Sequence, residues 1–182
     1  MKEYQSKISR AVLLGIFRDL DKYLMGIARK VRIYPIGGTK LTLDDAKTES
    51  KDIDIISSRV DFMVISDFVA NLELVRKIRI DVFPDAKMSG YSIPFYEAGS
   101  IRYPNRFRNI ELYSLDNAVF CLTKGLAGRP RDLKELDVFL KKYPVPLSRI
   151  KQEFARLKIN PESKFGLDSK LEYFIEACYS SA

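Results

Sequence analysis

The chain has 182 residues, 46% of them hydrophobic, and a formal net charge of +7. This length suits one compact domain, or one domain with a helical appendage, and the apolar fraction is enough for a buried core. The chain contains no histidine, which excludes Ser-His-Asp and Cys-His mechanisms within it and the usual histidine-containing zinc sites. The positive charge suits a polyanionic ligand such as a nucleotide or a nucleic acid, and it serves simple solubility equally well.

Two features of the sequence bear on its location. No apolar run reaches the roughly 20 residues that span a bilayer, and the first residues lack the apolar centre of a signal peptide. We therefore expect a soluble, cytoplasmic protein with no membrane partner. Cys121 and Cys178 have neither a metal-site nor a disulfide-framework spacing, so we expect buried thiols.

Helical and strand patterns alternate in the first half of the chain. Apolar residues three and four apart predict a long opening helix whose apolar stripe covers one face of a sheet. Branched and alternating segments predict the strands that follow. In order, the predicted elements are a helix over 3–29, a strand over 31–36, a loop or short helix over 41–51, a strand over 53–57, a helix over 59–72 and a strand over 75–83.

The second half becomes helical after a stretch that is harder to interpret. Residues 85–110 hold several glycines and prolines, which predict short strands or a hairpin. The aromatic residues and arginines between Tyr91 and Arg108 could bind nucleic acid, but we favour aromatic side chains that pack inward at a sheet edge. Four helices are predicted after it, over 114–127, 130–142, 147–157 and 164–179. The change in composition predicts an α/β core over 1–113 and a helical region over 114–182.

The candidate chemistry lies between Tyr34 and Ser57 and in the strand that follows. Asp52 and Asp54 are one residue apart in a strand pattern, so their side chains project to the same face. Two carboxylates on one face repel each other unless a cation lies between them. Asp81 lies in an otherwise apolar strand segment, where an unpaired carboxylate is costly to bury. If these strands are neighbours, the three acids can hold the divalent ions used in phosphoryl transfer.

The order of these motifs resembles the DNA polymerase beta nucleotidyltransferase superfamily. Gly37-Gly38-Thr39 is followed by Asp52-Ile53-Asp54 and then by Asp81, as in that superfamily. A second match, running from Leu115 to Leu136, includes Lys124 and Ala127-Gly128-Arg129-Pro130-Arg131-Asp132-Leu133, and is similar to the AbiEii-like toxin branch. The resemblance implies a nucleotidyltransferase-like mixed sheet flanked by helices, with a helical C-terminal region.

The resemblance also implies a role for each matching residue. Asp52, Asp54 and Asp81 would be the catalytic, metal-binding carboxylates, with Mg²⁺ or Mn²⁺ as the cofactor. Glycines let a backbone approach phosphate closely, so Gly37, Gly38 and Thr39 are expected at the nucleoside triphosphate. The resemblance places two basic residues and one acid at the same site: Lys124 and Arg129 are expected to bind the nucleotide, and Asp132 to support them or to cap its helix.

Three functions are compatible with this pattern. The leading one is an enzyme that moves a nucleoside monophosphate from a triphosphate to a hydroxyl of RNA, such as a tRNA 3′ end, or of a protein. The AbiEii-like resemblance adds the role of a toxin with an antitoxin protein as partner. The alternatives are an inactive nucleotide- or RNA-binding module on the same fold and, more weakly supported, a protein-interaction subunit.

Overall fold

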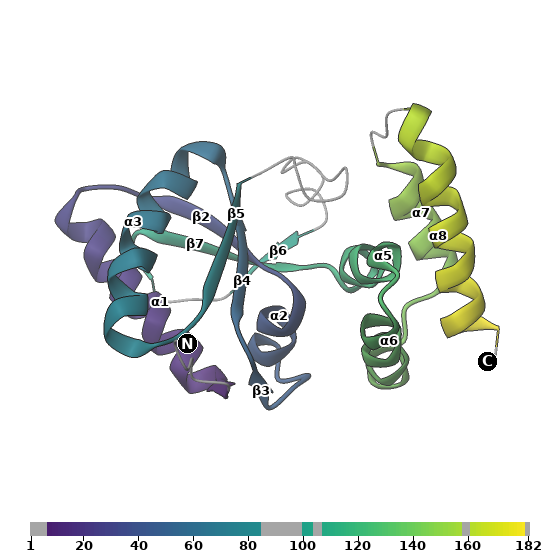
Figure 1. Cartoon of the computed structure of the whole chain (residues 1–182), viewed down its shortest axis with the longest axis horizontal. Coiled ribbons are helices and arrows are strands. Elements are labelled where there is room, and N and C mark those ends of the chain that lie inside the picture. The colour runs from purple at the N-terminus through teal and green to yellow at the C-terminus, as the bar shows by residue number, and fades with distance from the viewer. Residues whose placement is uncertain (1–6, 85–99, 104–106, 158–160, 181–182) are drawn as a thin grey trace. The chain divides into compact units, whose positions relative to one another are not determined.

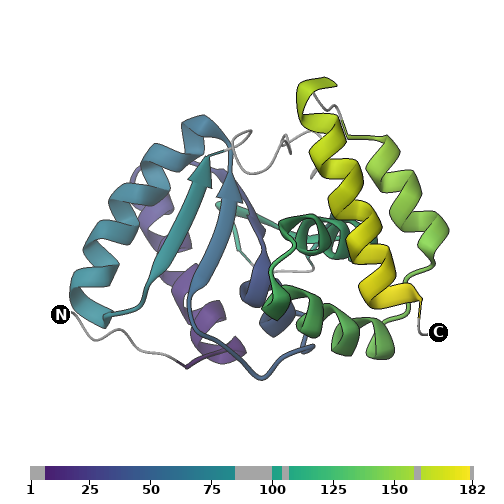
Figure 2. The same ribbon diagram turned by 45° about the vertical axis from the view of Figure 1, so that its right-hand side comes forward.

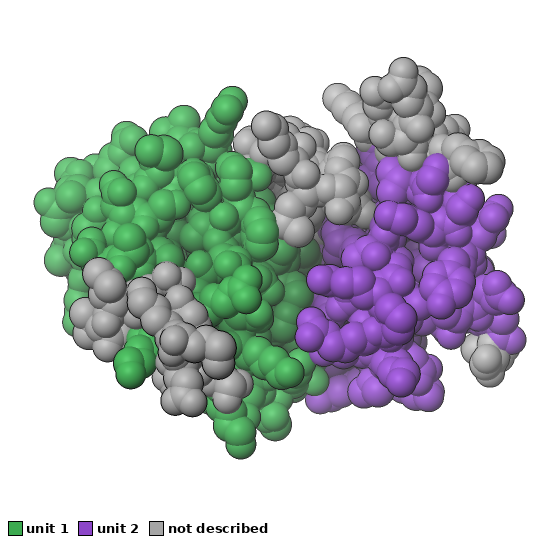
Figure 3. Space-filling view, in the orientation of Figure 1, with its two compact units in different colours: residues 1–87, 100–115 green, residues 88–99, 116–182 purple. Residues whose placement is uncertain are grey.

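The computed structural model describes residues 7–84, 100–103, 107–157 and 161–180. The chain divides into two compact units (Figure 3). Unit 1 comprises residues 1–87 and 100–115, and unit 2 comprises residues 88–99 and 116–182. The division predicted from the sequence, an α/β core over 1–113 and a helical region over 114–182, stays a prediction.

Unit 1 is built on a mixed β-sheet (Figure 1). Its five strands follow the order β5-β4-β2-β7-β6. The pairs β2–β7 and β4–β5 are parallel, whereas β2–β4 and β6–β7 are antiparallel. A separate antiparallel pair joins β1 and β3. The elements are β1 (Ile8–Ser9), α1 (Arg10–Gly26), β2 (Val31–Pro35), α2 (Gly37–Leu43), β3 (Glu49–Ser50), β4 (Ile53–Ser57), α3 (Arg59–Arg76), β5 (Ile80–Pro84), β6 (Ser100–Arg102) and β7 (Ile110–Leu115).

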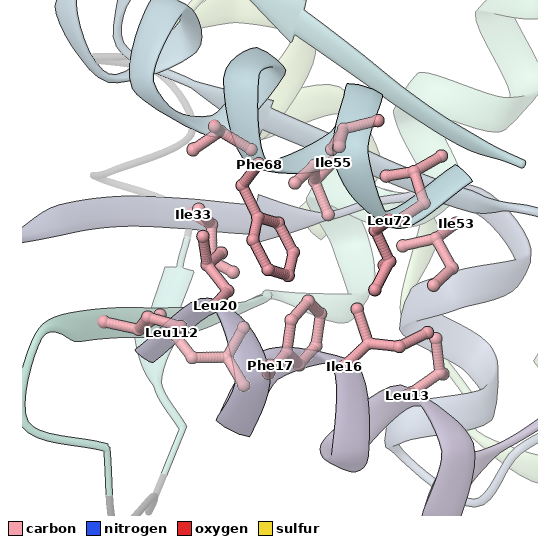
Figure 4. Close-up of a cluster of buried hydrophobic side chains, with 14 of the residues drawn as sticks. Leu13, Ile16, Phe17, Leu20, Ile33, Ile53, Ile55, Phe68, Leu72 and Leu112 are labelled. Carbon is pink, nitrogen blue, oxygen red and sulfur yellow. The ribbon is translucent and has the colours of Figure 1, made fainter. Parts of the chain in front are cut away.

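Helices α1 and α3 cover the same face of this sheet (Figure 2). Figure 4 shows their apolar side chains meeting those of the central strands. The buried cluster draws on alternate strand residues, among them Ile33, Ile53, Ile55 and Leu112. Because successive strand residues point to opposite faces, the residues between these belong to the face that α1 and α3 leave uncovered.

Unit 2 is helical in its described part. It contains α5 (Asn117–Ala127), α6 (Pro130–Lys142), α7 (Leu147–Ala155) and α8 (Pro161–Tyr179). Asp116 caps α5 by accepting a hydrogen bond from the backbone N–H of Ala118, and Gly128 ends it with φ +66°. The mixed α/β fold with a helical C-terminal region is confirmed. No helix among the described residues has the length and apolarity to cross a membrane.

Two predicted elements are wrong at their ends. The first helix begins at Arg10, because Ser9 caps it and pairs with Glu49 as a short strand. It ends at Gly26, shortly before Ala28 takes a left-handed φ of +52°. Residues 75 and 76 belong to α3, and the strand predicted from 75 starts only at Ile80. Lys77, also with φ +52°, separates the two.

The prediction for residues 85–110 can be judged only in part. Strands β6 and β7 pair as antiparallel neighbours, which fits the expected short strands, and the rest lies largely outside the described residues. Tyr103 and Phe107 pack against the core of unit 1. Tyr91, Phe95 and Tyr96 lie outside the described residues.

Candidate metal site

Strand pairing brings three aspartates together on the face of the sheet opposite α1 and α3. Asp54 in β4 lies directly opposite Asp81 in the parallel neighbour β5, and Asp52 precedes Asp54 by two residues. One carboxylate oxygen from each lies within 4.8 Å of the others, and all three residues are half-buried. Carboxylate oxygens are the ligands that Mg²⁺ and Mn²⁺ prefer, so the donor set fits such an ion.

A fourth residue completes this group. Ile53 is opposite Ile80 at the start of the β4–β5 pair, and Asp52 and Arg79 are the residues that immediately precede them. The backbone N–H of Ile53 donates to the carbonyl of Arg79 over 3.0 Å, which fixes this register. Nε of Arg79 lies 3.0 Å from Oδ2 of Asp81. We call Asp52, Asp54, Arg79 and Asp81 the carboxylate square.

The neighbouring aspartates change the pKa of Arg79. Its hydrogen bond to Asp81 raises the pKa of the Arg79 guanidinium, and the negative charges of Asp81, Asp52 and Asp54 add to the effect. The guanidinium is therefore cationic at every pH at which the protein functions. The carboxylate square holds three negative groups and one positive group, so it keeps an excess of two negative charges.

The absence of side chains at Gly37 and Gly38 lets this turn lie close to Asp54 and Ser50. Gly37 has φ +55°, and a Cβ there would lie 3.1 Å from Oδ2 of Asp54. A Cβ on Gly38 would lie 2.7 Å from Oγ of Ser50, closer than real contacts allow. A side chain at Gly37 would therefore strain the backbone, and one at Gly38 would have to displace the Ser50 hydroxyl, so glycine suits both positions at the start of α2 beside β4. Their predicted contact with a triphosphate stays a prediction.

Thr39 links this turn to the acidic strand. Its hydroxyl is fully buried, accepts a hydrogen bond of 2.8 Å from the backbone N–H of Asp54 and donates to the carbonyl of Asp52 over 3.4 Å. Ser50 donates to the same carbonyl over 2.7 Å. The Thr39 side chain therefore positions both aspartates, and a contact from Thr39 to a phosphate would have to use its backbone.

A second polar chain in unit 1 ties α2 to β7. Nζ of Lys40, a side chain that is 1% exposed, lies 2.6 Å from Oδ2 of Asp44. Asp44 also accepts a hydrogen bond of 3.0 Å from the Ser114 hydroxyl. Asp45 pairs with Arg10 at 3.0 Å. These contacts assign structural partners to two acids of the 40–50 segment.

The predicted basic residues belong to unit 2 and form an ion network around a buried pair, Lys124 and Asp132. Nζ of Lys124, a residue that is 8% exposed, donates to Oδ1 of Asp132 over 3.0 Å and also to Glu135. Nε of Arg129 donates to Oδ2 of Asp132 over 2.5 Å. Two cations thus face two carboxylates, and Asp132 orients both Lys124 and Arg129. A contact of Lys124 or Arg129 with a nucleotide stays a prediction.

Comparison with known proteins supports the fold. The chain is similar to a solved structure described as the crystal structure of an antigenic nucleotidyltransferase-like protein from Paracoccidioides brasiliensis. The likeness covers 95% of this chain and 99% of that chain, with 12% sequence identity and a TM-score of 0.52. Neither a family model nor a curated protein matches the sequence. The fold is therefore nucleotidyltransferase-like, and the AbiEii-like branch stays a prediction.

Sequence reasoning did not single out Arg79 or Lys40. A signal for Arg79 was present, because it alternates with Asp81 and so shares its strand face. Lys40 and Asp44 have the four-residue spacing of a helical ion pair, but the short helix that was one of two alternatives for this segment was predicted only from residue 41.

Proposed function

We propose that the protein is a metal-dependent nucleotidyltransferase, which moves a nucleoside monophosphate from a nucleoside triphosphate to a hydroxyl acceptor and releases pyrophosphate. The observation that carries this proposal is the convergence of carboxylate oxygens of Asp52, Asp54 and Asp81 within 4.8 Å of one another, on the face of the sheet opposite α1 and α3. The nucleotidyltransferase-like fold supports it.

In this proposal the three aspartates hold Mg²⁺ or Mn²⁺. Divalent ions at such a site supply charge stabilisation for the attacking and leaving oxygens of phosphoryl transfer. The chain itself contributes alignment: paired strands set the spacing of Asp54 and Asp81, and Thr39 fixes the backbone that carries Asp52 and Asp54. Gly37 and Gly38 bring a backbone with little steric bulk to the edge of the same group, where the triphosphate is proposed to bind.

The acceptor is proposed from chemistry and resemblance. A net charge of +7 suits an RNA acceptor such as a tRNA 3′ end, and a protein hydroxyl is the second acceptor class. The toxin role with an antitoxin partner follows from the AbiEii-like resemblance alone. It predicts that induced expression of the wild-type chain arrests growth, and that a chain lacking Asp52 and Asp54 carboxylates does not.

The decisive experiment is a transfer assay with each of four α-labelled nucleoside triphosphates, using total RNA and total protein as acceptors with Mg²⁺ or Mn²⁺. The wild type is compared with Asp52→Ala/Asp54→Ala. We expect label transfer by the wild type and a loss of at least about a hundredfold in the double variant, since the carboxylates are proposed to hold the reaction's electrostatic stabilisation.

A matched control comes from the covered side of the sheet. Asp67 is exposed on α3, so Asp67→Ala removes an aspartate away from the square. It should leave transfer within about twofold of the wild type, as an exposed surface change does. Transfer that survives in the double variant would contradict the proposal.

A second function is favoured by one observation. Asp81 already has a cationic partner, Arg79, at 3.0 Å, which is compatible with an inactive nucleotide- or RNA-binding module on this fold. That function predicts no transfer by the wild type, together with nucleotide or RNA binding that persists when divalent ions are chelated.

A further inference from the structure

One of the four residues of the carboxylate square is a cation, Arg79. Asp54 and Asp81 lie opposite each other on two parallel strands, and Asp52 and Arg79 are the residues that immediately precede those strands. A strand face built only to gather negative charge has no need of a cation there. The position of Arg79 therefore has to be explained together with the three acids.

Arg79 has a hydrogen-bonded backbone and a largely exposed side chain. Its carbonyl accepts the 3.0 Å hydrogen bond from the N–H of Ile53, whereas its side chain is 58% exposed. The Asp81 side chain is 30% exposed. An ion pair with this much solvent contact contributes little stability, so the guanidinium can leave Asp81 without disturbing the sheet.

The charges also bear on how many divalent ions the square can hold. With Arg79 in place, the excess of two negative charges matches one divalent ion. A second divalent ion would meet a site with no remaining negative charge and with a cation bonded to one of its ligands. A triphosphate brings its own negative charge, which would both accompany a second ion and give the guanidinium another partner.

We propose that Arg79 is a resident counter-ion that competes with divalent metal for Asp81 and keeps the square from filling until a nucleoside triphosphate arrives. This inference rests on the proposed nucleotidyltransferase function, because it concerns the regulation of the same site. It makes metal occupancy of Asp81 conditional on substrate, and it makes Arg79 a positioning residue with no direct role in the chemistry.

The test is direct binding of Mn²⁺, followed by electron paramagnetic resonance or calorimetry, in the absence of nucleotide. Arg79→Met removes the charge and keeps the length of the side chain. We expect it to bind Mn²⁺ about tenfold more tightly than the wild type at low salt, because a nearby cation is removed. Arg79→Lys keeps the charge and should bind within about threefold of the wild type. If Arg79→Met folds poorly, Arg79→Gln serves the same purpose.

Two further measurements separate electrostatic competition from a merely structural role. The difference between wild type and Arg79→Met should shrink as ionic strength rises, since exposed charges are screened. It should also shrink when a non-hydrolysable triphosphate is added, since the guanidinium then has another partner. Arg18 is exposed on α1, on the covered side of the sheet, so Arg18→Met should leave the Mn²⁺ affinity unchanged.

The outcomes distinguish this inference from the function on which it rests. If Arg79→Met binds Mn²⁺ no more tightly than the wild type, and both bind through Asp52 and Asp54, the counter-ion role is wrong while the nucleotidyltransferase proposal stands. If Arg79→Met gains Mn²⁺ affinity but the wild type transfers no nucleotide, the counter-ion role stands and the transferase proposal is wrong. If neither chain binds Mn²⁺ with or without triphosphate, both are wrong.

Discussion

The two units of the molecule each hold a cluster of charged side chains, and the clusters are built on opposite principles. The carboxylate square of unit 1 is half-buried and keeps an excess of two negative charges. The ion network of unit 2 matches Lys124 and Arg129 with Asp132 and Glu135, and the side chains of Lys124 and Asp132 are only 9% and 1% exposed. The carboxylate square has an excess of negative charge on half-buried acids, whereas the network of unit 2 has matched charges around a buried pair, Lys124 and Asp132, with the Arg129 side chain 68% exposed.

Charge balance and burial separate a cluster that suits ligand binding from one that supports the structure. A buried charge is tolerated when partners and hydrogen bonds replace its water, and Lys124 has two carboxylates and lies 5.9 Å from the ring centre of Phe120. Like charges at a solvated site repel each other unless a cation offsets them, and Arg79 offsets only one of the three carboxylate charges of the square. The unbalanced cluster is thus the better candidate for a metal site.

The largest predicted effect tests whether the network of unit 2 is structural. Asp132→Ala should lower the free energy of unfolding by about 3 kcal/mol, because it leaves the buried ammonium of Lys124 with Glu135 alone. Chemical denaturation measures this loss. Asp137→Ala is the matched control, since Asp137 lies on the same helix in an exposed pair with Lys141; it should cost less than about 0.5 kcal/mol. Equal losses in the two variants would show that the network is no more structural than a surface ion pair.

A smaller effect tests how the turn positions the acids of unit 1. Thr39→Val leaves the backbone N–H of Asp54 without its hydroxyl partner and should cost about 1–2 kcal/mol. The same helix offers a matched control in Thr42, equally buried, whose Oγ1 has no hydrogen-bond partner within the described part of the chain. Thr42→Val should be neutral or stabilising. Denaturation curves that move by the same amount in both variants would contradict the positioning role of Thr39.

The next prediction concerns how the stability of unit 2 depends on pH. Tyr179 in unit 2 donates a hydrogen bond of 3.0 Å to the carbonyl of Val145, and burial raises the pKa of Tyr179. The folded state therefore holds this proton more tightly than the unfolded state, so the stabilisation is complete below the unfolded pKa of about 10 and is lost as pH rises above it.

Tyr179→Phe should cost about 1 kcal/mol at pH 8 through the lost hydrogen bond and should flatten the decline in stability above pH 10. Tyr173, which is 52% exposed, supplies the control: Tyr173→Phe should keep both the stability at pH 8 and the alkaline decline. An unchanged alkaline decline in Tyr179→Phe would show that other groups cause it.

Much of this organisation follows from local sequence patterns. Alternation predicted that Asp52 and Asp54 share a face, and the apolar runs predicted the strands that carry them. The pairing of β4 with β5 aligns Asp54 with Asp81. This pairing depends on contacts between distant segments, so local patterns could not predict it, and the metal site was expected only if the strands were neighbours. Lys124 shows the limit most clearly. Its spacing matched a motif, but its buried partners Asp132 and Glu135 depend on how α5 and α6 pack.

The smallest predicted effect is on the free energy of unfolding of the carboxylate square, which should not fall as it does in the variants above. Asp54→Asn removes one of three clustered carboxylates, so it relieves repulsion that Arg79 balances only in part. We expect the free energy of unfolding without metal to stay the same or rise by up to about 0.5 kcal/mol, in contrast to the loss expected for Asp132→Ala. Added Mn²⁺ should stabilise the wild type against denaturation by mass action and should not stabilise Asp54→Asn. A marked loss of stability in Asp54→Asn without metal would mean that its carboxylate is structural, like that of Asp132, and the distinction between the two clusters would no longer hold.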